Sequence, residues 1–286
     1  MLGSVGDLVE DVVVHLHEQV NVASDTRATV VRRRGGSAAN VIAAACRAGG
    51  AARFIGQVGD DATGRGLTDA LVAYGADVQV RRAGRTGTII VLVDTHGERT
   101  MLSDRAACTE LTDPDPAWLD GLHTLHIPYY SLAVEPLATA TATLAGWALE
   151  RGVRISIDTS SAAVLHNIGP SVALDRIRAL QPSVVLANEL EAAALGPLLC
   201  PAHLGGALVI VKQGAEPAIV MVAGMPPQEV PAQLVPDVRD TTGAGDAFAA
   251  GLLLSLAAGA DAITATDAGH RVAADAVRLA SISAGA

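Results

Sequence analysis

The stretch Asp240-Thr-Thr-Gly-Ala-Gly-Asp-Ala-Phe248 leads directly into the apolar segment Ala247–Ala257. The apolar segment predicts a helix, and Gly243 and Gly245 lack side chains where the backbone must approach a ligand closely. Backbone N–H groups at the start of a helix point outward without partners, and the helix dipole adds partial positive charge. The stretch therefore predicts an anion site suited to a phosphate group.

Asp246 lies in the same turn. A carboxylate beside an anion site is poorly suited to holding phosphate, but it can accept the proton of an attacking hydroxyl as a general base. The alternative is that Asp246 only caps the helix, because Asp is among the preferred N-cap residues. This part of the sequence leaves both interpretations open.

Around this stretch, short apolar runs alternate with Ala-rich helical patterns. Strands are predicted at Met1–Val5, Arg53–Val58, Thr88–Asp94, Thr124–Ile127, Arg154–Asp158, Ser183–Ala187, Ala207–Val211 and Ala218–Val222. Helices are predicted at Ala38–Arg47, Thr63–Tyr74, Glu135–Arg151, Asn188–Leu195 and Asp246–Ala257. This alternation predicts an α/β fold, with a mostly parallel sheet covered by helices on both faces, in a single domain over residues 1–286.

Two β-rich stretches, Val12–Val31 and Val78–Ser103, contain too little helix for a crossover between parallel strands. Within the second, Val91–Leu102 predicts a hairpin that turns at His96-Gly97. We expect these stretches to form a small second sheet that covers the main domain.

The composition limits the function classes. The formal net charge is −10, which disfavours nucleic acid as a partner. The three cysteines are widely separated and form no CxxC pair, so we expect no disulfide framework and a reducing, cytoplasmic location. We expect neither a signal peptide nor a membrane-spanning segment.

The stretch Asp240–Phe248 resembles the C-terminal signature of the PfkB/ribokinase family of carbohydrate kinases. The resemblance, which extends from Gly6 to about Ala280, implies a Rossmann-like α/β/α sandwich, ribokinase-like, with a small β-sheet lid. It implies phosphorylation of a hydroxyl of a sugar or a sugar-like molecule, with ATP and Mg²⁺. The matching residues are Asp246 as the catalytic base and Gly243, Ala244 and Gly245 as the anion hole.

Two N-terminal segments resemble the substrate side of the family. In Gly35-Gly-Ser-Ala-Ala-Asn40, the match assigns Gly35, Gly36 and Asn40 to sugar hydroxyls. The segment Gly6–Asp11 resembles the exit of the family's first strand, whose terminal acid binds substrate; this points to Asp11, with Asp7 as second choice.

Arginines near these segments offer further substrate contacts. Some family members place an arginine in the area of Arg105, where it would reach the substrate from the lid. The run Arg32-Arg-Arg34 could attract a phosphate or carboxylate on the substrate, although such a charge run is also typical of a solvated loop.

The nucleotide side is carried by two further matches. Asn188-Glu-Leu-Glu191 resembles the NxxE motif that positions metal-bound phosphate, with Glu191 acting on Mg²⁺ through water. The alternative is a helix start with acids that favour the dipole. Lys212-Gln-Gly-Ala215 resembles the nucleotide-side turn, with Gly214 retained and Pro217 in place of a later family glycine.

Asp240 and Thr242 match positions at which the family often binds a monovalent cation, so K⁺ is a further candidate. Lid sheets in this family often pair, which implies a homodimer.

Three alternative hypotheses for the function remain. One is a nucleoside kinase of the same family, and another is a sugar-binding regulator without activity. The third is a dinucleotide oxidoreductase, which would need a glycine fingerprint opening a helix after the first strand. The segment Gly3–Gly6 does not provide that fingerprint.

Overall fold

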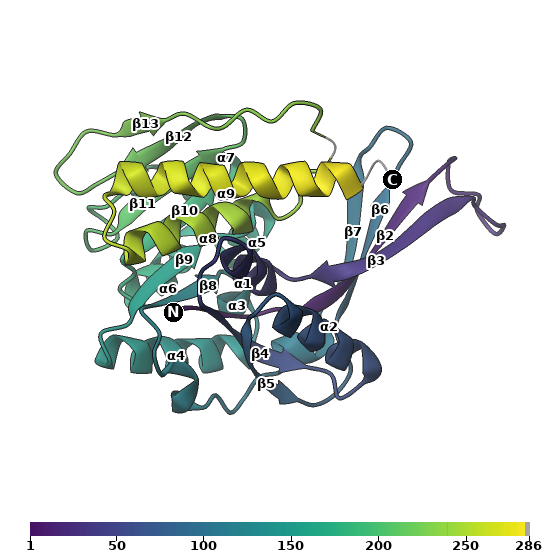
Figure 1. Cartoon of the computed structure of the whole chain (residues 1–286), viewed down its shortest axis with the longest axis horizontal. Helices are drawn as coiled ribbons and strands as arrows, with labels where there is room; N and C mark the ends of the chain where they lie inside the picture. The colour runs from purple at the N-terminus through teal and green to yellow at the C-terminus, as the bar shows by residue number, and fades with distance from the viewer. Residues whose placement is uncertain (239, 284–286) are drawn as a thin grey trace.

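A computed structural model describes residues 1–238 and 240–283 of the chain, and it places their strands in two separate sheets (Figure 1). The large sheet has nine strands in the order β13-β12-β11-β10-β9-β8-β1-β4-β5. Its strands are β1 (Leu2–Val5), β4 (Ala52–Val58), β5 (Asp77–Arg82), β8 (Thr124–Pro128), β9 (Arg154–Asp158), β10 (Val184–Asn188), β11 (Leu208–Gln213), β12 (Glu216–Met221) and β13 (Gln228–Val230). All neighbours pair in parallel except β12, which runs antiparallel to both β11 and β13.

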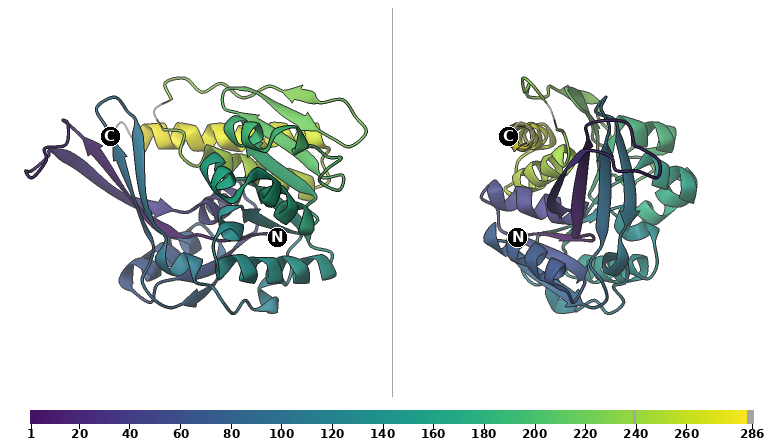
Figure 2. Two further views of the ribbon diagram at one scale, coloured as in Figure 1. Left: turned by 180° about the vertical axis from the view of Figure 1, so that it is seen from behind. Right: turned by 90° about the vertical axis from the view of Figure 1, so that its right-hand side faces the viewer.

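Helices cover both faces of the large sheet, as the edge-on view in Figure 2 shows. One face carries α1 (Ser37–Arg47), α2 (Ala62–Ala73), α8 (Ala244–Ala257) and α9 (Ala262–Ser283). The other carries α3 (Tyr130–Ala133), α4 (Leu137–Glu150), α5 (Ala162–Ile168), α6 (Pro170–Ala179) and α7 (Glu189–Leu195). Short 3₁₀ helices lie at Ala106–Thr109, Pro116–Leu119 and Gly196–Leu198.

The strand β10 shows how the sequence produces this layering. Val184 and Leu186 belong to the apolar core under α1 and α8, whereas Val185 and Ala187 belong to the core under α4 and α6. Because successive side chains of a strand point to opposite faces, a continuous apolar run is buried on both sides. The predicted three-layer α/β architecture is confirmed.

The small sheet has the strand order β3-β2-β6-β7, formed by β2 (Val9–Leu16), β3 (Ala28–Gly35), β6 (Thr88–Val93) and β7 (Arg99–Asp104). It projects from one end of the molecule, at the right of Figure 1. The chain enters it directly from β1 and leaves it from β3 into α1. The hairpin between β6 and β7 contains Gly97 at φ 85°, in the turn where the sequence predicts it.

The bounds of the small sheet differ from the two predicted stretches. The segment from Val78 to Arg82 lies in β5 of the large sheet, where it pairs in parallel with β4. The helix α2 supplies the crossover that parallel strands need. The unit β4-α2-β5 therefore belongs to the large sheet and not to the small one. In addition, β2 begins at Val9 and β3 continues to Gly35.

Four helices, α3, α5, α6 and α9, were not among the predicted elements. Across residues 1–238 and 240–283, no helix has both the length and the apolar character required to cross a bilayer.

Candidate active site

The site is built around the start of α8, where Gly243 adopts φ 77° and precedes the first helical turn. The amide of Ala244 donates to the carbonyl oxygen of Thr241 at 3.1 Å. The amides of Gly245 and Asp246 bond to no backbone acceptor within the described residues. Of the three residues predicted for the anion hole, Ala244 therefore has its amide occupied by a turn.

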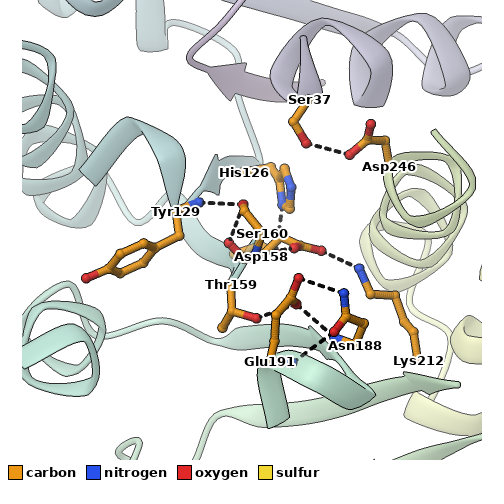
Figure 3. A network of polar contacts seen from close by, with 11 residues as sticks. Ser37, His126, Tyr129, Asp158, Thr159, Ser160, Asn188, Glu191, Lys212 and Asp246 are labelled. Carbon is orange, nitrogen blue, oxygen red and sulfur yellow. Dashed lines mark hydrogen bonds and ion pairs between the residues drawn. The ribbon is translucent and has the colours of Figure 1, made fainter. Parts of the chain in front are cut away.

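The carboxylate of Asp246 is held by two donors from α1. Ser37 Oγ donates to Asp246 Oδ1 at 2.6 Å (Figure 3). Asn40 Nδ2 donates to Oδ2 at 2.9 Å. The helices α1 and α8 thus bring the N-terminal and C-terminal motifs together across 206 and 209 residues of sequence.

The pKa of the Asp246 carboxyl lies well above the usual value for an aspartate. Burial raises the pKa of Asp246 to about 7, although the hydrogen bonds from Ser37 and Asn40 act in the opposite direction. The nearby Asp158 carboxylate also raises this pKa, and the Lys212 ammonium lowers it. A base with a pKa near the working pH is well matched to accepting a hydroxyl proton.

The glycine pair brings the β2 carboxylate against the start of α1. A Cβ atom at Gly35 would lie 2.1 Å from Asp11 Oδ1, and one at Gly36 would lie 2.3 Å from the carbonyl oxygen of Asp7. Gly36 also adopts φ 101°, a conformation that side-chain-bearing residues rarely take. Only glycine at these positions allows Asp11 to lie this close to the α1 N-terminus.

The two acids considered for substrate binding have different surroundings. Asp7 Oδ2 pairs with Arg105 Nη1 at 2.5 Å, and Asp7 Oδ1 accepts from the amide of Ala38 at 3.3 Å. Among the described residues, Asp11 has only a long ion pair, 4.0 Å from Arg33 Nε, and burial raises its pKa. Asp11 therefore has more hydrogen-bonding capacity left for a ligand than Asp7.

Arg105 is fixed from two sides. Besides Asp7, its guanidinium lies 4.2 Å from the ring centroid of Tyr130. This cation–π contact holds the arginine beside the end of β1.

On the nucleotide side, Lys212 Nζ lies 2.5 Å from Asp158 Oδ2. A Cβ atom on Gly245 would lie only 3.2 Å from Lys212 Nζ, so the ammonium stands directly beside the turn at the start of α8. Burial lowers the pKa of Lys212, but the carboxylates of Asp158, Glu191 and Asp246 together outweigh it, and the net pKa is raised. Lys212 therefore carries a full positive charge next to the free amide of Gly245.

Asn188 and Glu191 form a complete capping box at the start of α7. Glu191 Oε2 accepts from the Asn188 amide at 2.8 Å and from Thr159 Oγ1 at 2.7 Å, while Oε1 accepts from Asn188 Nδ2 at 2.7 Å. Burial raises the pKa of Glu191, and the Asp158 carboxylate adds to this effect. With three bonds already made, Glu191 fits Mg²⁺ through an intervening water better than by direct coordination.

Gly214 lies in the turn between β11 and β12 at φ 61°, as suits a tight turn after the strand. Pro217 follows within β12.

The carboxylate of Asp240 binds two arginines of the small sheet. Arg33 Nη1 donates to Asp240 Oδ2 at 3.0 Å, and Arg99 Nη2 donates to Oδ1 at 2.9 Å. Arg99 Nη1 also donates to Thr242 Oγ1 at 2.6 Å. We call this group of four residues the clasp.

The clasp contains both residues predicted to bind K⁺, Asp240 and Thr242. Burial alone would raise the pKa of Asp240, but hydrogen bonds from Thr242 and from the two arginines hold it far below its usual range. The ionised carboxylate is already neutralised by the protein's own cations, so the residues predicted for K⁺ fit an added cation poorly in this arrangement.

Several residues of the site were not singled out as site residues in the sequence. Ser37 lies inside the Gly35–Asn40 stretch, and Asp158 ends a predicted strand of the parallel sheet. The carboxyl end of such a strand is where ligands bind in open α/β sheets, a signal that could have identified Asp158. Arg33 belongs to the run considered for an anion on the substrate. Neither Arg33 nor Arg99 carries a local signal for its pairing with Asp240, which is distant in sequence.

The chain is similar to known proteins along most of its length. Residues 2–284 match the family described as "pfkB family carbohydrate kinase". A fructokinase of Klebsiella pneumoniae is 33% identical over 254 residues, which cover 84% of this chain and 82% of that protein. An ATP-dependent ribose-1-phosphate kinase of Halopiger xanaduensis is 32% identical over 225 residues, covering 77% and 72% of the two chains.

Solved structures share the fold. An adenosine kinase of Sinorhizobium meliloti aligns with a TM-score of 0.83 at 23% identity, over 98% of both chains. A probable sugar kinase of Rhizobium etli aligns with a TM-score of 0.84 at 23% identity, over 97% of this chain and 92% of the other. The match along nearly the whole sequence shows that the chain belongs to the pfkB family of carbohydrate kinases.

Proposed function

We propose that the protein transfers the γ-phosphoryl group of ATP to a hydroxyl of a small sugar, with Asp246 as the general base. The observation that carries this proposal is the position of a proton-accepting carboxylate beside two amides and one ammonium group. Asp246, the amides of Gly245 and Asp246, and Lys212 supply a base and an anion site at the same point.

In the proposed reaction, the acceptor hydroxyl lies between Asp246 and the Asp11–Gly35 contact. Its oxygen forms a bond to the γ-phosphorus while the bond from that phosphorus to the ADP oxygen breaks. The hydroxyl proton passes to an Asp246 carboxylate oxygen. The amides and Lys212 stabilise charge on the transferred group, so positioning and electrostatics supply most of the rate acceleration.

Mg²⁺, when bound with ATP, would neutralise charge on the phosphates. Glu191 is the residue that would position it through water. The small sheet would act as a lid that keeps water from the reacting groups.

The aromatic residues favour a sugar over a nucleoside acceptor. Tyr129 is fully buried, and the ring of Tyr130 is covered by Arg105. Phe54 and Phe248 are core residues. The three buried rings offer no open face for a nucleobase, and Arg105 already stacks on Tyr130, although nucleoside kinases commonly stack the base on such a face.

The test is ADP release from Mg·ATP with a panel of sugars, sugar phosphates, sugar acids and nucleosides. The names of the relatives place fructose and ribose 1-phosphate first in this panel. We expect turnover with one class of sugar, loss of that turnover in Asp246→Asn, and retention in Asp69→Asn, which alters an exposed carboxylate on α2. Equal turnover in the wild type and Asp246→Asn would overturn the proposal.

The pH dependence follows from the raised pKa of Asp246, about 7. The base must be ionised to accept a proton, so kcat/KM for the acceptor should fall about tenfold per pH unit below the midpoint and level off above it. Initial rates between about pH 5.5 and about pH 8.5 measure this profile. A profile that is flat across that range would mean that Asp246 does not act as the base.

Lys212→Met should raise the KM for ATP by roughly tenfold, because a charged donor next to the phosphate site is lost. The single variant also leaves Asp158 without its partner. The double variant Lys212→Met with Asp158→Asn separates the two effects. It should recover thermal stability but not the ATP affinity, as measured by thermal melts and by titration calorimetry. Recovery of both would assign Lys212 a structural role alone.

A further inference from the structure

Arg34 differs from its two neighbours in the arginine run on β3. Arg32 pairs with Glu10 at 2.6 Å and Arg33 pairs with Asp240 at 3.0 Å. Arg34 Nη1 instead donates to Asn40 Oδ1 at 2.9 Å, and no carboxylate in the described part of the chain lies within 4.0 Å of its guanidinium nitrogens.

Burying the Arg34 guanidinium without a carboxylate partner costs free energy of desolvation. Arg34 is half-buried, and burial lowers its pKa. A desolvated guanidinium is usually compensated by a carboxylate, because a neutral amide oxygen offsets much less of the desolvation cost. The hydrogen bond from Arg34 instead constrains the residue that accepts it.

That residue is Asn40, which stands between Arg34 and the general base. Its Oδ1 accepts from Arg34, and its Nδ2 donates to Asp246 Oδ2 at 2.9 Å. A guanidinium group has five N–H donors and no acceptor, so only the oxygen of the Asn40 amide can face it. The nitrogen of the same amide must then face Asp246.

We propose that Arg34 is a positioning residue that fixes the orientation of the Asn40 amide, so that its nitrogen and not its oxygen faces Asp246. Without Arg34, the amide can turn over and place Oδ1 against the carboxylate. An amide oxygen repels an ionised carboxylate but accepts a hydrogen bond from a protonated one. Arg34 thereby keeps the base in its proton-accepting form.

The other groups that face Asp246 do not depend on this orientation. Ser37 on α1 donates to the opposite carboxylate oxygen, Asp158 on β9 contributes a negative charge, and Lys212 on β11 contributes a positive charge. On β3 the charged group is Arg34 itself, whose direct attraction to Asp246 acts in the same direction as its effect through Asn40. The inference deepens the proposed function and rests on the role of Asp246 as the base.

The test compares Arg34→Met, which removes the donors, with Arg34→Lys, which keeps the charge and can restore one donor. Arg32→Met is the matched control, because Arg32 is on the same strand, is 65% exposed and pairs only with Glu10 among the described carboxylates. In each variant we would measure the pH profile of kcat/KM. The titration of the Asp246 carboxyl would be followed by carbon-13 NMR in the substrate-free protein, and assigned with Asp246→Asn.

In Arg34→Met we expect both midpoints to rise by about 0.5–1 pH unit, the size of one typical net hydrogen bond. Arg34→Lys should reverse much of this shift, and Arg32→Met should leave it unchanged. If Arg34→Met raised only the KM for the acceptor and moved neither midpoint, Arg34 would be a substrate contact and the inference would be overturned.

An unchanged NMR midpoint in both Arg34 variants would also overturn it. Should the wild type phosphorylate no acceptor at all, the proposed function fails, but the NMR titration still decides the role of Arg34. If Arg34→Met does not fold, the comparison of Arg34→Lys with the wild type provides the same decision on a smaller shift.

Discussion

Replacement of Asp246 by asparagine is expected to lower kcat by roughly 10²–10⁴-fold, the usual contribution of a positioned general base. The shape of the site should survive, since asparagine has nearly the same volume as aspartate. Its oxygen can accept from Asn40, and its nitrogen can donate to the hydroxyl of Ser37, which rotates to accept. The loss should therefore appear in the chemical step and not in folding.

Single-turnover kinetics and calorimetry separate these contributions. The affinity for ATP should be unchanged or slightly improved, because a negative charge next to the phosphate site is removed. Asp69→Asn serves as the control for a carboxylate-to-amide change elsewhere. A variant that retained more than about a tenth of wild-type kcat would show that the proton leaves by another route.

The second large effect is expected for Gly35→Ala. The new methyl group would lie 2.1 Å from Asp11 Oδ1 and 2.3 Å from Asp11 Cγ, far inside contact distance. The Asp11 carboxylate must then move by an ångström or more from the acceptor site. A displacement of this size can cost about 10²-fold in rate, so we expect kcat/KM for the sugar to fall by at least that factor.

The affinity for ATP should change little in Gly35→Ala, because Lys212 and the start of α8 lie on the other side of the site. Gly66→Ala is the matched control: it is also a glycine-to-alanine change, but no atom lies within 4 Å of the added Cβ and φ is not positive. Wild-type kinetics for the sugar in Gly35→Ala would remove Asp11 from the acceptor site.

Most of the large sheet could be predicted from local sequence patterns. Its central strands are continuous apolar runs, and their burial depends mainly on hydrophobicity that can be read locally. The segment Val78–Arg82 was assigned to the small sheet because the stretch Val78–Ser103 contains too little helix for a crossover; the crossover helix α2 lies before that stretch. As the edge strand of the large sheet, β5 is only half covered, so its sequence resembles that of a lid strand.

The helix α9 was missed for a different reason. Its N-terminus is marked by Asp261, whose Oδ1 accepts from the amide of Thr264 at 2.8 Å. The helix carries polar residues along much of its length, so it does not form a continuous apolar run of the kind that marks α8. The capping signal was present but was not used.

Within the site, motif resemblance located residues that act through short local geometry, such as Gly35 and Asp246. Residues that act through long-range pairs could not be found in this way. Arg33 and Asp240 are 207 positions apart, and Arg99 and Asp240 are 141 apart. No local pattern states which of the chain's arginines reaches a given carboxylate.

The clasp also has a consequence for the order in which the protein matures on the ribosome. Asp240 and Asp246 emerge after both of the small-sheet hairpins and after almost all of the large sheet. At typical synthesis rates of about 5–20 residues per second, roughly 10–40 s separate the appearance of Ser37 from that of Asp246. During that interval Arg33 and Arg99 have no Asp240 to bind and α1 has no α8 to pack against. The nascent chain therefore acquires the proposed phosphate-binding turn, the proposed base and the anchor of its small sheet together, in the last stage of synthesis.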